Sequence, residues 1–530
     1  MAGSGNERVS ARATSVVGIA ILCSRVLGLV REMVIASLFG ASRNLDAFLT
    51  AFRAPNMLRD LFAEGALSTA FVTTFSKKIT AEGDESAWAL ANKVATLTTV
   101  FMSGVTLLGI VLAPGLIGIL APGFDPEKAK LTILLTQVMF PFILLVSLAA
   151  LAMGMLNAKN VFGVPAMASS FFNLGSIVGG VLLAWWMDPA FGPRALIGLS
   201  LGTLIGGLLQ LVVQVPALMN VGFKLRADFN WRDEGVRKVL QLMGPAVIAA
   251  SAVQVNVLIN SGFASYLQDG AVSWLNIAFR LMQLPLGIFG VAVATVTLPL
   301  ISRSAAKGDM AEFSGALAHA LRLVMLLTIP SAIGLIILAE PIISLIYQHG
   351  RFTAAATAQT AAALRFYAIG LVGYSSVKVL APAFYALDRR NLPMFVSIFS
   401  IALNFALNYT LTFHMKLGHR GLALSTSVIA ITNFLLLYIM MRRYAGRLET
   451  KTMFVTLAKL LVAGACLAAV CWLGARVFFP AGITQTQWHK LLGVGVTVVL
   501  GTVVFFGAAY LLRVAELQDV VVVARRKLGR

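Results

Sequence analysis

Fourteen long apolar stretches follow one another along this chain of 530 residues, and they constrain its fold more than any other feature. A helix needs roughly 20 apolar residues to cross a bilayer. The stretches show almost no period-two alternation, which favours helices over an outer-membrane barrel. The predicted spans are 15–39, 45–75, 88–113, 129–157, 162–187, 194–219, 236–266, 271–301, 313–339, 357–386, 393–413, 421–441, 452–479 and 488–513. We therefore expect an all-α integral membrane protein with 14 transmembrane helices.

Positive charge is distributed unevenly between alternate loops. With the N-terminus inside, the cytoplasmic segments hold 23 Lys and Arg residues and the opposite loops hold seven. This asymmetry follows the positive-inside rule and predicts a plasma-membrane protein with both termini in the cytoplasm. The net charge of +20 is thereby explained as a topology signal, with contacts to anionic membrane lipids as a lesser role, and it does not indicate a nucleic-acid partner.

The sequence contains no convincing signature of a cofactor, a metal or an ATPase. Cys23, Cys466 and Cys471 fall within predicted spans, so neither a disulfide framework nor a metal site is expected. We find no P-loop, nucleophile elbow or dinucleotide fingerprint in a suitable context. Without a phosphate loop, any transport would be driven by a membrane potential, an ion gradient or consumption of the substrate.

The chain repeats itself at a separation near 227 residues. The segment Ala51–Arg53 recurs as Ala278–Arg280, with the same Ala-Phe-Arg sequence. Two further matches follow in the same order, between 112–124 and 338–352 and between 156–165 and 387–393. Three matches in order at a nearly constant offset indicate an internal duplication rather than chance.

The duplication divides the first twelve spans into two six-helix halves. Because six is even, both halves enter from the cytoplasmic side, so the repeat is parallel. Parallel halves related by an axis along the membrane normal enclose a central cavity and can rock for alternating access. We expect an N-lobe at residues 1–222, a C-lobe at 223–447, and a pair of extra helices with a cytoplasmic tail at 448–530.

Ionised side chains interrupt the first, second and eighth predicted spans. Each such group costs about 3 kcal/mol or more at the centre of a bilayer, so together they predict a wet interior cavity. The arginines in these spans are Arg25, Arg31, Arg53, Arg59 and Arg280, against the acids Glu32, Asp60 and Glu64, with Asp46 near the outer end. The excess of guanidinium groups suits an anionic cargo, above all the oxygens of a phosphate.

The second predicted span carries a polar stripe, which consists of Arg53, Asn56, Asp60 and Glu64 at spacings of three, four and four. Pro55 predicts a kink or break within it. The carboxyls of Asp60 and Glu64 lie four residues apart, so one of them is expected to be protonated or clamped by an arginine, and Glu64 becomes a candidate gate. In the alternative interpretation the charges pair internally, for example Arg25 with Glu32, and only hold helices together.

Several of these residues stand in motifs that resemble one known family. The motifs are Ser24–Gly28 with Arg31, Asp46–Phe48, Pro55–Arg59, Phe62–Ala66, Ser273-Trp274, Arg280–Met282, Gly287–Gly290 and Lys378–Pro382. In this order, and over nearly the whole chain, they resemble the MurJ (MviN) family of bacterial lipid II flippases. The resemblance implies the fold of the multidrug/oligosaccharidyl-lipid/polysaccharide (MOP) exporters, in which two six-helix lobes surround a cationic cavity, here with two extra C-terminal helices.

The resemblance also implies a function and roles for residues. The cargo would be lipid II, an undecaprenyl-diphosphate-linked disaccharide pentapeptide, moved from the cytoplasmic to the periplasmic leaflet of the inner membrane for peptidoglycan synthesis. Cell-wall synthesis proteins would be partners, and the two C-terminal helices would form a groove for the lipid tail. By position, the diphosphate would be bound by Arg25, Arg31, Arg59 and Arg280, and the gate and cavity would include Glu64, Asp46, Arg53, Asn56 and Glu32.

The chain departs from the family pattern at three positions. Phe279 stands where an acid is common, Asp60 where a basic residue is common, and Glu32 where aspartate is common. No sodium site can be matched. The alternatives are an exporter of the same fold for drugs or another polyprenyl-linked glycan, and a membrane enzyme such as a polyprenyl-phosphate transferase. The enzyme is disfavoured because the acids lie among arginines within spans rather than at an interface.

Overall fold

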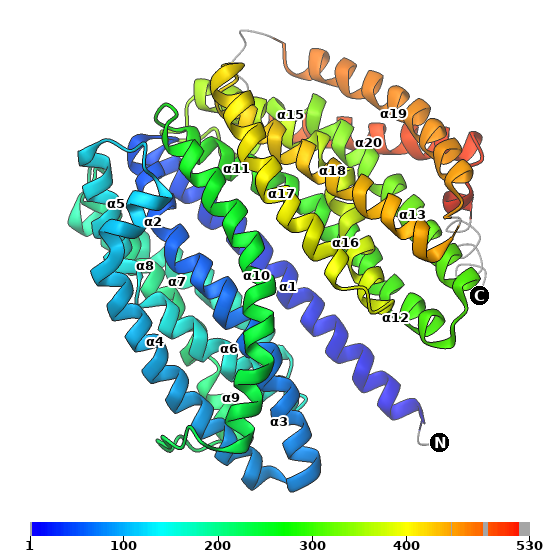
Figure 1. Ribbon diagram of the computed structural model, residues 1–530. Coiled ribbons are helices and arrows are strands. Elements are labelled where there is room, and N and C mark those ends of the chain that lie inside the picture. Colours follow the sequence, from blue (N-terminus) through cyan, green and yellow to red (C-terminus); the bar gives the residue numbers. More distant parts are fainter. Residues whose placement is uncertain (1–2, 447, 481–485, 519–530) are drawn as a thin grey trace. The chain divides into compact units, whose positions relative to one another are not determined.

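The computed structural model describes residues 3–446, 448–480 and 486–518, and all regular structure in these ranges is helical (Figure 1). By their contacts the helices divide into two compact units, Met1–Val272 and Ser273–Arg530. Three stretches, labelled η, are π-helices, which have a wider turn than an α-helix. The predicted all-α fold is confirmed.

In the described part of the first unit there are ten α-helices and one π-helix. Along the chain these are α1 (Gly3–Phe39), α2 (Arg43–Leu58), η1 (Arg59–Leu67), α3 (Ser68–Glu82), α4 (Asp84–Leu120), α5 (Pro126–Met139), α6 (Phe142–Ala158), α7 (Gly163–Met187), α8 (Ala195–Val212), α9 (Val215–Asn220) and α10 (Glu234–Ser265).

The second unit begins near the start of α11 and ends with the C-terminal helix pair. Its elements are α11 (Ala271–Pro285), η2 (Leu286–Gly290), α12 (Val291–Lys307), α13 (Met310–Ile337), α14 (Ala339–Tyr347), α15 (Ala354–Ile369), α16 (Leu371–Ala386), α17 (Asn391–Tyr409), η3 (Thr410–His414), α18 (His419–Ala445), α19 (Thr450–Phe478) and α20 (Gln487–Leu511).

Each of the fourteen predicted spans coincides with one helix or one run of consecutive helices. By length and composition, ten helical runs among the described residues are apolar enough to cross a membrane, and the bent pair α15–α16 makes eleven. The other three predicted spans are α1, the run α2–η1–α3, and α10. The first two carry the charged residues singled out above, and charge lowers the hydropathy of a span.

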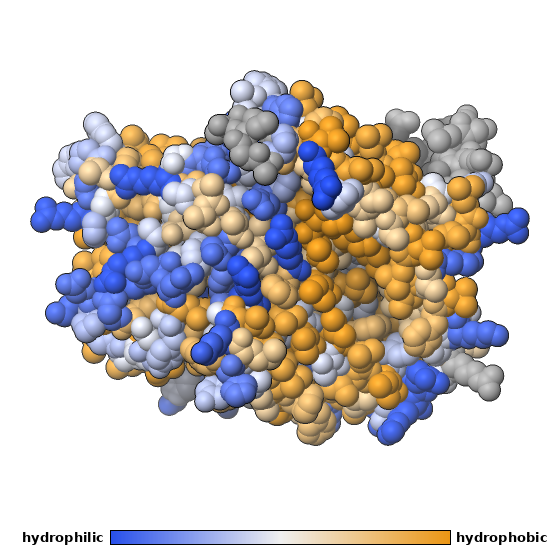
Figure 2. All heavy atoms as spheres, turned by 90° about the horizontal axis from the view of Figure 1, so that it is seen from above, coloured by the Kyte–Doolittle hydropathy of each residue, from blue (hydrophilic) through white to orange (hydrophobic). Residues whose placement is uncertain are grey.

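Apolar side chains cover the outside of many helices, as a lipid environment requires. On α4, Leu107, Leu108 and Val111 are exposed, and on α19 so are Phe454 and Trp472. Figure 2 shows such apolar surface spread widely over one face of the molecule. Apolar surface of this extent would be unfavourable in water, so the exposed side chains indicate contact with acyl chains.

Small residues bring α7 and α8 into close contact in the first unit. Gly198, Gly202 and Gly206 recur every fourth residue on α8 and face α7. A Cβ atom at Gly202 would lie only 2.2 Å from the Cα of Gly180, so only glycine fits there. Lipid tails are as apolar as leucine, so helices in a membrane associate through this kind of close backbone packing.

The internal repeat is visible in the helix ends. η1 begins at Arg59, six residues after Arg53, and η2 begins at Leu286, six residues after Arg280. Leu120 and Tyr347, which end α4 and α14, are likewise 227 apart in residue number. The broken run α5–α6 corresponds to the pair α15–α16, which bends by 43°. The two halves therefore share a π-turn after the repeated arginine and a broken fourth span, whereas α4 is continuous where the second half has α13 and α14, and η3 has no counterpart in α7.

The sequence repeat and the helix contacts assign α10 to different parts of the molecule. Counted along the repeat, α10 is the first helix of the second half, and the sequence places a boundary at residue 222. By contacts α10 belongs to the first unit, where it packs against η1, α3 and α4, and the division falls after Val272. The repeat assigns each helix by its order along the chain, whereas the units are defined by which helices pack together.

The second unit is built around α13, which packs against α12, α15, α16 and α19. Its core includes the fully buried Phe313, Leu321 and Phe384. α19 and α20 lie along one side of this unit and pack against each other (Figure 1). Arg322, buried on α13, forms ion pairs with Glu516 after α20 and, at 2.6 Å, with Glu449 before α19. These ion pairs link both ends of the C-terminal helix pair, α19 and α20, to α13.

Candidate functional site

α1 carries three of the predicted site residues and is held in place by α7. Arg25 is exposed, whereas Arg31 and Glu32 are half-buried. The Asn173 side-chain amide on α7 donates a hydrogen bond of 3.1 Å to the backbone carbonyl of Ser24. The Arg31 guanidinium lies 5.2 Å from the centre of the Phe172 ring, a cation–π contact. Side chains of α7 therefore fix both the backbone beside Arg25 and the head group of Arg31.

The second span carries charge through an α-helix that continues as a π-helix. The Arg53 side chain on α2 donates a hydrogen bond to Ser261 on α10. The guanidinium of Arg59, the first residue of η1, forms an ion pair of 2.9 Å with Asp60. Asn56, which stands between Arg53 and Arg59 in the sequence, is half-buried. The clamp that the sequence predicted for one of the two acids is thus formed at Asp60 by its neighbour in the chain.

The predicted polar stripe runs from an α-helix into a π-helix. Its spacings of three and four assumed an α-helix through Glu64, but the structure has a π-helix from Arg59 to Leu67. The later residues of the stripe therefore stand on a helix with a wider turn than the spacing assumed. π-turns occur frequently at functional sites, and this one contains Arg59 and Glu64. The side chain of Glu64 itself lies outside the described residues.

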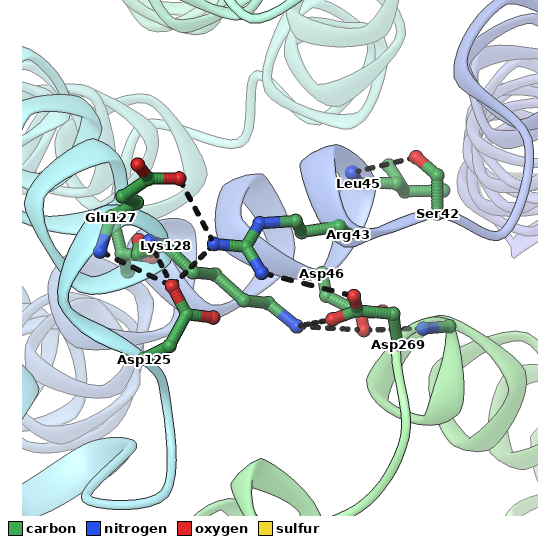
Figure 3. Close-up of polar contacts among 10 residues, drawn as sticks. Ser42, Arg43, Leu45, Asp46, Asp125, Glu127, Lys128 and Asp269 are labelled. Carbon is green, nitrogen blue, oxygen red and sulfur yellow. Dashed lines mark hydrogen bonds and ion pairs between the residues drawn. The ribbon is translucent and has the colours of Figure 1, made fainter.

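A charged cluster lies at the other end of α2, where α2, α5 and the loop after α10 meet (Figure 3). The Asp46 carboxylate accepts a hydrogen bond of 2.7 Å from the backbone N–H of Gly270 and pairs with the Lys128 ammonium at 3.2 Å. Lys128 also forms an ion pair of 2.8 Å with Asp269 and lies 4.1 Å from the centre of the Phe124 ring. We call Asp46, Lys128, Asp269 and Gly270 the buried latch, after the Asp46–Lys128 pair; the side chain of Asp269 itself is 52% exposed.

Burial makes the latch energetically important. The side chains of Asp46 and Lys128 are only 1% and 3% exposed. Removing one partner of a buried ion pair costs about 3–5 kcal/mol, because the other charge is left without compensation. The sequence placed Asp46 among the gate and cavity residues but did not single out Lys128. Lys128 stands three residues into α5, and nothing in the sequence indicates that its ammonium turns inward.

A more exposed ring of charge surrounds the latch. Arg43 pairs with Asp125 and approaches Glu127 at 3.8 Å and Asp269 at 3.9 Å (Figure 3). Asp125 is also the N-cap of α5 and accepts the backbone N–H groups of Glu127 and Lys128. The hydrogen bond from Arg43 lowers the pKa of Asp125 below its ordinary value. Helix N-termini favour negative charge, and the starts of α2 and α5 both present acids here.

Arg280 belongs to the second unit, where it lies exposed on α11. The residue before it, Phe279, is one of the departures from the family pattern. Its ring contacts Tyr367 edge-on at 5.3 Å and Tyr374 at 6.5 Å between ring centres. An aromatic cluster therefore occupies the place next to Arg280, and Phe279 fits it better than a carboxylate would.

The charged residues of this site suit the binding of an anion. Four arginines, Arg25, Arg31, Arg53 and Arg59, stand on α1, α2 and η1, and guanidinium groups bind phosphate oxygens in a bidentate manner. Among the described residues, no group of three or more His, Cys, Asp or Glu side chains could hold a metal ion. The absence of a cofactor stays a prediction.

Comparison with known protein families gives one consistent result. The profile of the family described as "Lipid II flippase MurJ" matches residues 35–492. The lipid II flippase MurJ of Burkholderia cenocepacia is 38% identical over 429 residues, which cover 80% of this chain and 82% of that protein. The probable lipid II flippase MurJ of Vibrio cholerae is 33% identical over 500 residues, covering 92% and 94% of the two chains.

Solved structures agree with the sequence comparison. A structure described as lipid II flippase MurJ in an inward closed conformation superposes with a TM-score of 0.73 at 26% identity, covering 92% of this chain and 98% of that one. An inward-facing multidrug resistance transporter of the MATE family, from the MOP superfamily, gives a TM-score of 0.66 at 15% identity. The second likeness shows the fold alone, and the predicted MOP fold is confirmed.

Proposed function

Because the chain belongs to the MurJ family of lipid II flippases, we propose that it moves lipid II from the cytoplasmic to the periplasmic leaflet of a bacterial inner membrane. The observation that carries the proposal is the family match over residues 35–492. Proteins of this family are transporters rather than enzymes, since flipping changes the position of a lipid and not its covalent structure. Both termini would lie in the cytoplasm, as the asymmetry of Lys and Arg predicts.

The diphosphate of the cargo would be bound by arginines in a cationic cavity. We assign this role to Arg25, Arg31, Arg59 and Arg280. The first three lie on α1 and η1 in one unit and are at least partly accessible, and Arg280 is exposed on α11. A diphosphate carries enough oxygens to receive several guanidinium groups, and such charge-assisted bonds are roughly twice as strong as neutral ones.

The buried latch would close one side of this cavity during alternating access. Opening that side requires the loop that holds Asp269 and Gly270 to leave Asp46 and Lys128. The latch supports this role because it is short-ranged and buried, so it is either formed or broken. Two-state transporters rely on interfaces of this kind rather than on gradual deformation.

The energy source and the partners of the flippase remain part of the proposal. Membrane potential or an ion gradient would drive the cycle, with Glu64 and Glu32 as candidate gating and cavity residues. Enzymes of cell-wall synthesis would supply lipid II on one side and consume it on the other. No residue of the chain is assigned to them.

The test is leaflet-resolved accessibility of lipid II in cells whose only flippase is a variant of this chain. Arg25→Ala, Arg59→Ala and Arg280→Ala should each trap lipid II in the cytoplasmic leaflet and arrest peptidoglycan synthesis. Arg303→Ala is the matched control, because Arg303 is an exposed arginine on α12 outside the assigned set.

The outcomes separate the alternatives. Normal flipping by all three variants, with protein present in the membrane at the level of the control, would refute the binding assignment. Altered drug sensitivity or capsule with normal lipid II exposure would indicate an exporter of another cargo. Conversion of lipid II into a covalently different product would indicate an enzyme.

A further inference from the structure

A basic cavity of about 610 Å³ lies in the first unit where the end of α3 meets the start of α10. Its lining residues include none of the arginines assigned to the cargo, and they stand in or beside the loops predicted to be cytoplasmic. Four cations and two acids line it: Lys77, Lys78, Arg237 and Lys238, and Glu82 and Glu234. A volume of this size is in the range of ligand-binding pockets.

The acids of the cavity do not neutralise its cations. Lys78 pairs with Glu82 at 2.9 Å, and Glu82 also accepts a hydrogen bond of 2.5 Å from the Ser86 hydroxyl. The bond from Ser86, together with Lys78, lowers the pKa of Glu82. No ion pair between described residues involves Lys77, Arg237 or Lys238, although Glu234 also lines the cavity. The cavity thus keeps a positive excess that suits an anion.

The walls of the cavity are held firmly. Asp233, the N-cap of α10, accepts the backbone N–H of Gly235 at 2.9 Å and forms an ion pair with Lys93 of α4 at 2.6 Å. A Cβ atom at Gly235 would lie 2.8 Å from the Leu90 side chain, so α10 starts in close contact with α4. A binding site built on fixed helices loses little entropy when it is filled.

Exposed apolar side chains place this cavity at the level of lipid headgroups. The segment that leads into α10 exposes Leu225, Phe229 and Trp231, with 76%, 63% and 62% of their surface accessible, and cations alternate with them. Exposed aromatic and basic residues together are typical of the membrane–water interface. Beyond the cavity, α10 exposes Leu242, which follows the lining residue Lys238 by four residues and so lies on the same face of the helix, where it suits an acyl chain.

We propose that the basic cavity binds the phosphate of an anionic phospholipid headgroup, with an acyl chain of that lipid along Leu242. The combination of phosphate-binding cations and an adjacent exposed leucine matches an amphipathic ligand better than a free anion. Basic pockets between transmembrane helices on the cytoplasmic side bind such headgroups. The site does not depend on the identity of the transported cargo.

The experiment uses the full chain in nanodiscs of phosphatidylcholine and phosphatidylglycerol in equal parts, with retained lipid counted by native mass spectrometry. The natural chain should retain phosphatidylglycerol in preference to phosphatidylcholine. The double variant Lys77→Gln/Lys238→Gln should weaken this retention by roughly 5-fold to 30-fold, since each cation near the surface contributes about 5-fold. The matched control Lys224→Gln/Arg226→Gln removes two cations of the neighbouring loop that do not line the cavity, and it should retain the lipid.

Two further arms decide between the proposal and its alternatives. The charge-preserving double variant Lys77→Arg/Lys238→Arg should bind as the natural chain does, which separates lost charge from misfolding. Equal loss in the lining and control variants would overturn the proposal, as would retention without preference for phosphatidylglycerol. Displacement of phosphatidylglycerol by inorganic phosphate alone, or preferential binding of lipid II at these residues, would assign the cavity to another anion.

Discussion

The two halves of the repeat share a helical scheme but differ in charge at equivalent positions. Lys128 is the third residue of α5, and the third residue of the corresponding α15 is Ala356. Asp46 on α2 corresponds to Ser273 on α11, in line with the shared Ala-Phe-Arg motif. Ser273 and Ala356 are both buried, as Asp46 and Lys128 are. The same backbone therefore encloses an ion pair in the first half and neutral side chains in the second.

This difference separates what the repeat preserves from what it does not. The π-turn six residues after the repeated arginine and the aromatic residue before that arginine occur in both halves, so they serve the shared architecture. The buried Asp46–Lys128 pair has neutral counterparts in the second half, so the architecture does not require it. The latch is therefore a candidate for function rather than a requirement of the fold.

The π-helices show the same contrast. η1 extends over nine residues and η2 over five, although both begin six residues after the repeated arginine. η1 starts with the Arg59–Asp60 ion pair, whereas η2 starts with the buried Leu286. A common turn geometry thus presents charge in one half and an apolar contact in the other.

The largest expected effect comes from replacing the latch residues with those at the equivalent positions of the second half. Lys128→Ala leaves the buried Asp46 carboxylate without its ammonium and should lower the free energy of unfolding by about 3–5 kcal/mol. The double variant Asp46→Ser/Lys128→Ala copies Ser273 and Ala356 and should recover most of this loss. Thermal unfolding of the purified protein in detergent measures both. If the double variant is as unstable as the sum of the two single variants, the comparison of halves is wrong.

A smaller effect should distinguish the two equivalent arginines. Arg53→Ala removes a charge-assisted hydrogen bond to Ser261 and should cost about 1–2 kcal/mol of stability. Arg280→Ala should cost less, because Arg280 is exposed on α11, yet it should abolish flipping. Unfolding midpoints and leaflet-resolved lipid II accessibility are measured on the same preparations and strains. An Arg280→Ala variant that flips normally but unfolds easily would reverse the assignment.

The smallest effect should be equal in the two halves. Phe52 packs against Phe142 with 5.5 Å between ring centres, and its counterpart Phe279 packs against Tyr367 at 5.3 Å. Phe52→Leu removes the pair with Phe142, and Phe279→Leu removes the pair with Tyr367 and the more distant contact with Tyr374; each should cost about 0.5–1.5 kcal/mol. Unequal losses, measured by the same unfolding assay, would show that Phe279 has a role beyond packing.

Much of this architecture could be predicted from sequence because its signals are local or repeated. Apolar stretches of sufficient length specify helices in a membrane whatever their neighbours, and the recurrence of Ala-Phe-Arg revealed the duplication without a structure. The ion-pair partner of Asp60 was also within reach, because Arg59 is its neighbour in the chain.

Other features depend on which segments meet in space. The π-helix at Arg59, which packs against α10 and α6, was not predicted, because residue spacing does not distinguish a π-turn from an α-helical turn. The inward turn of Lys128 toward Asp46 joins residues 82 apart in the chain, and that of Arg322 toward Glu516 joins residues 194 apart.

The sequence by itself determined a helical membrane protein with a duplicated core and an excess of arginine in its first spans, because hydropathy, repetition and charge are properties of the chain. Only the tertiary structure decided which charges are buried and paired, and that α10 packs with the first unit. The physical reason is that the cost of a buried charge depends on its nearest partner, and that partner is chosen by folding.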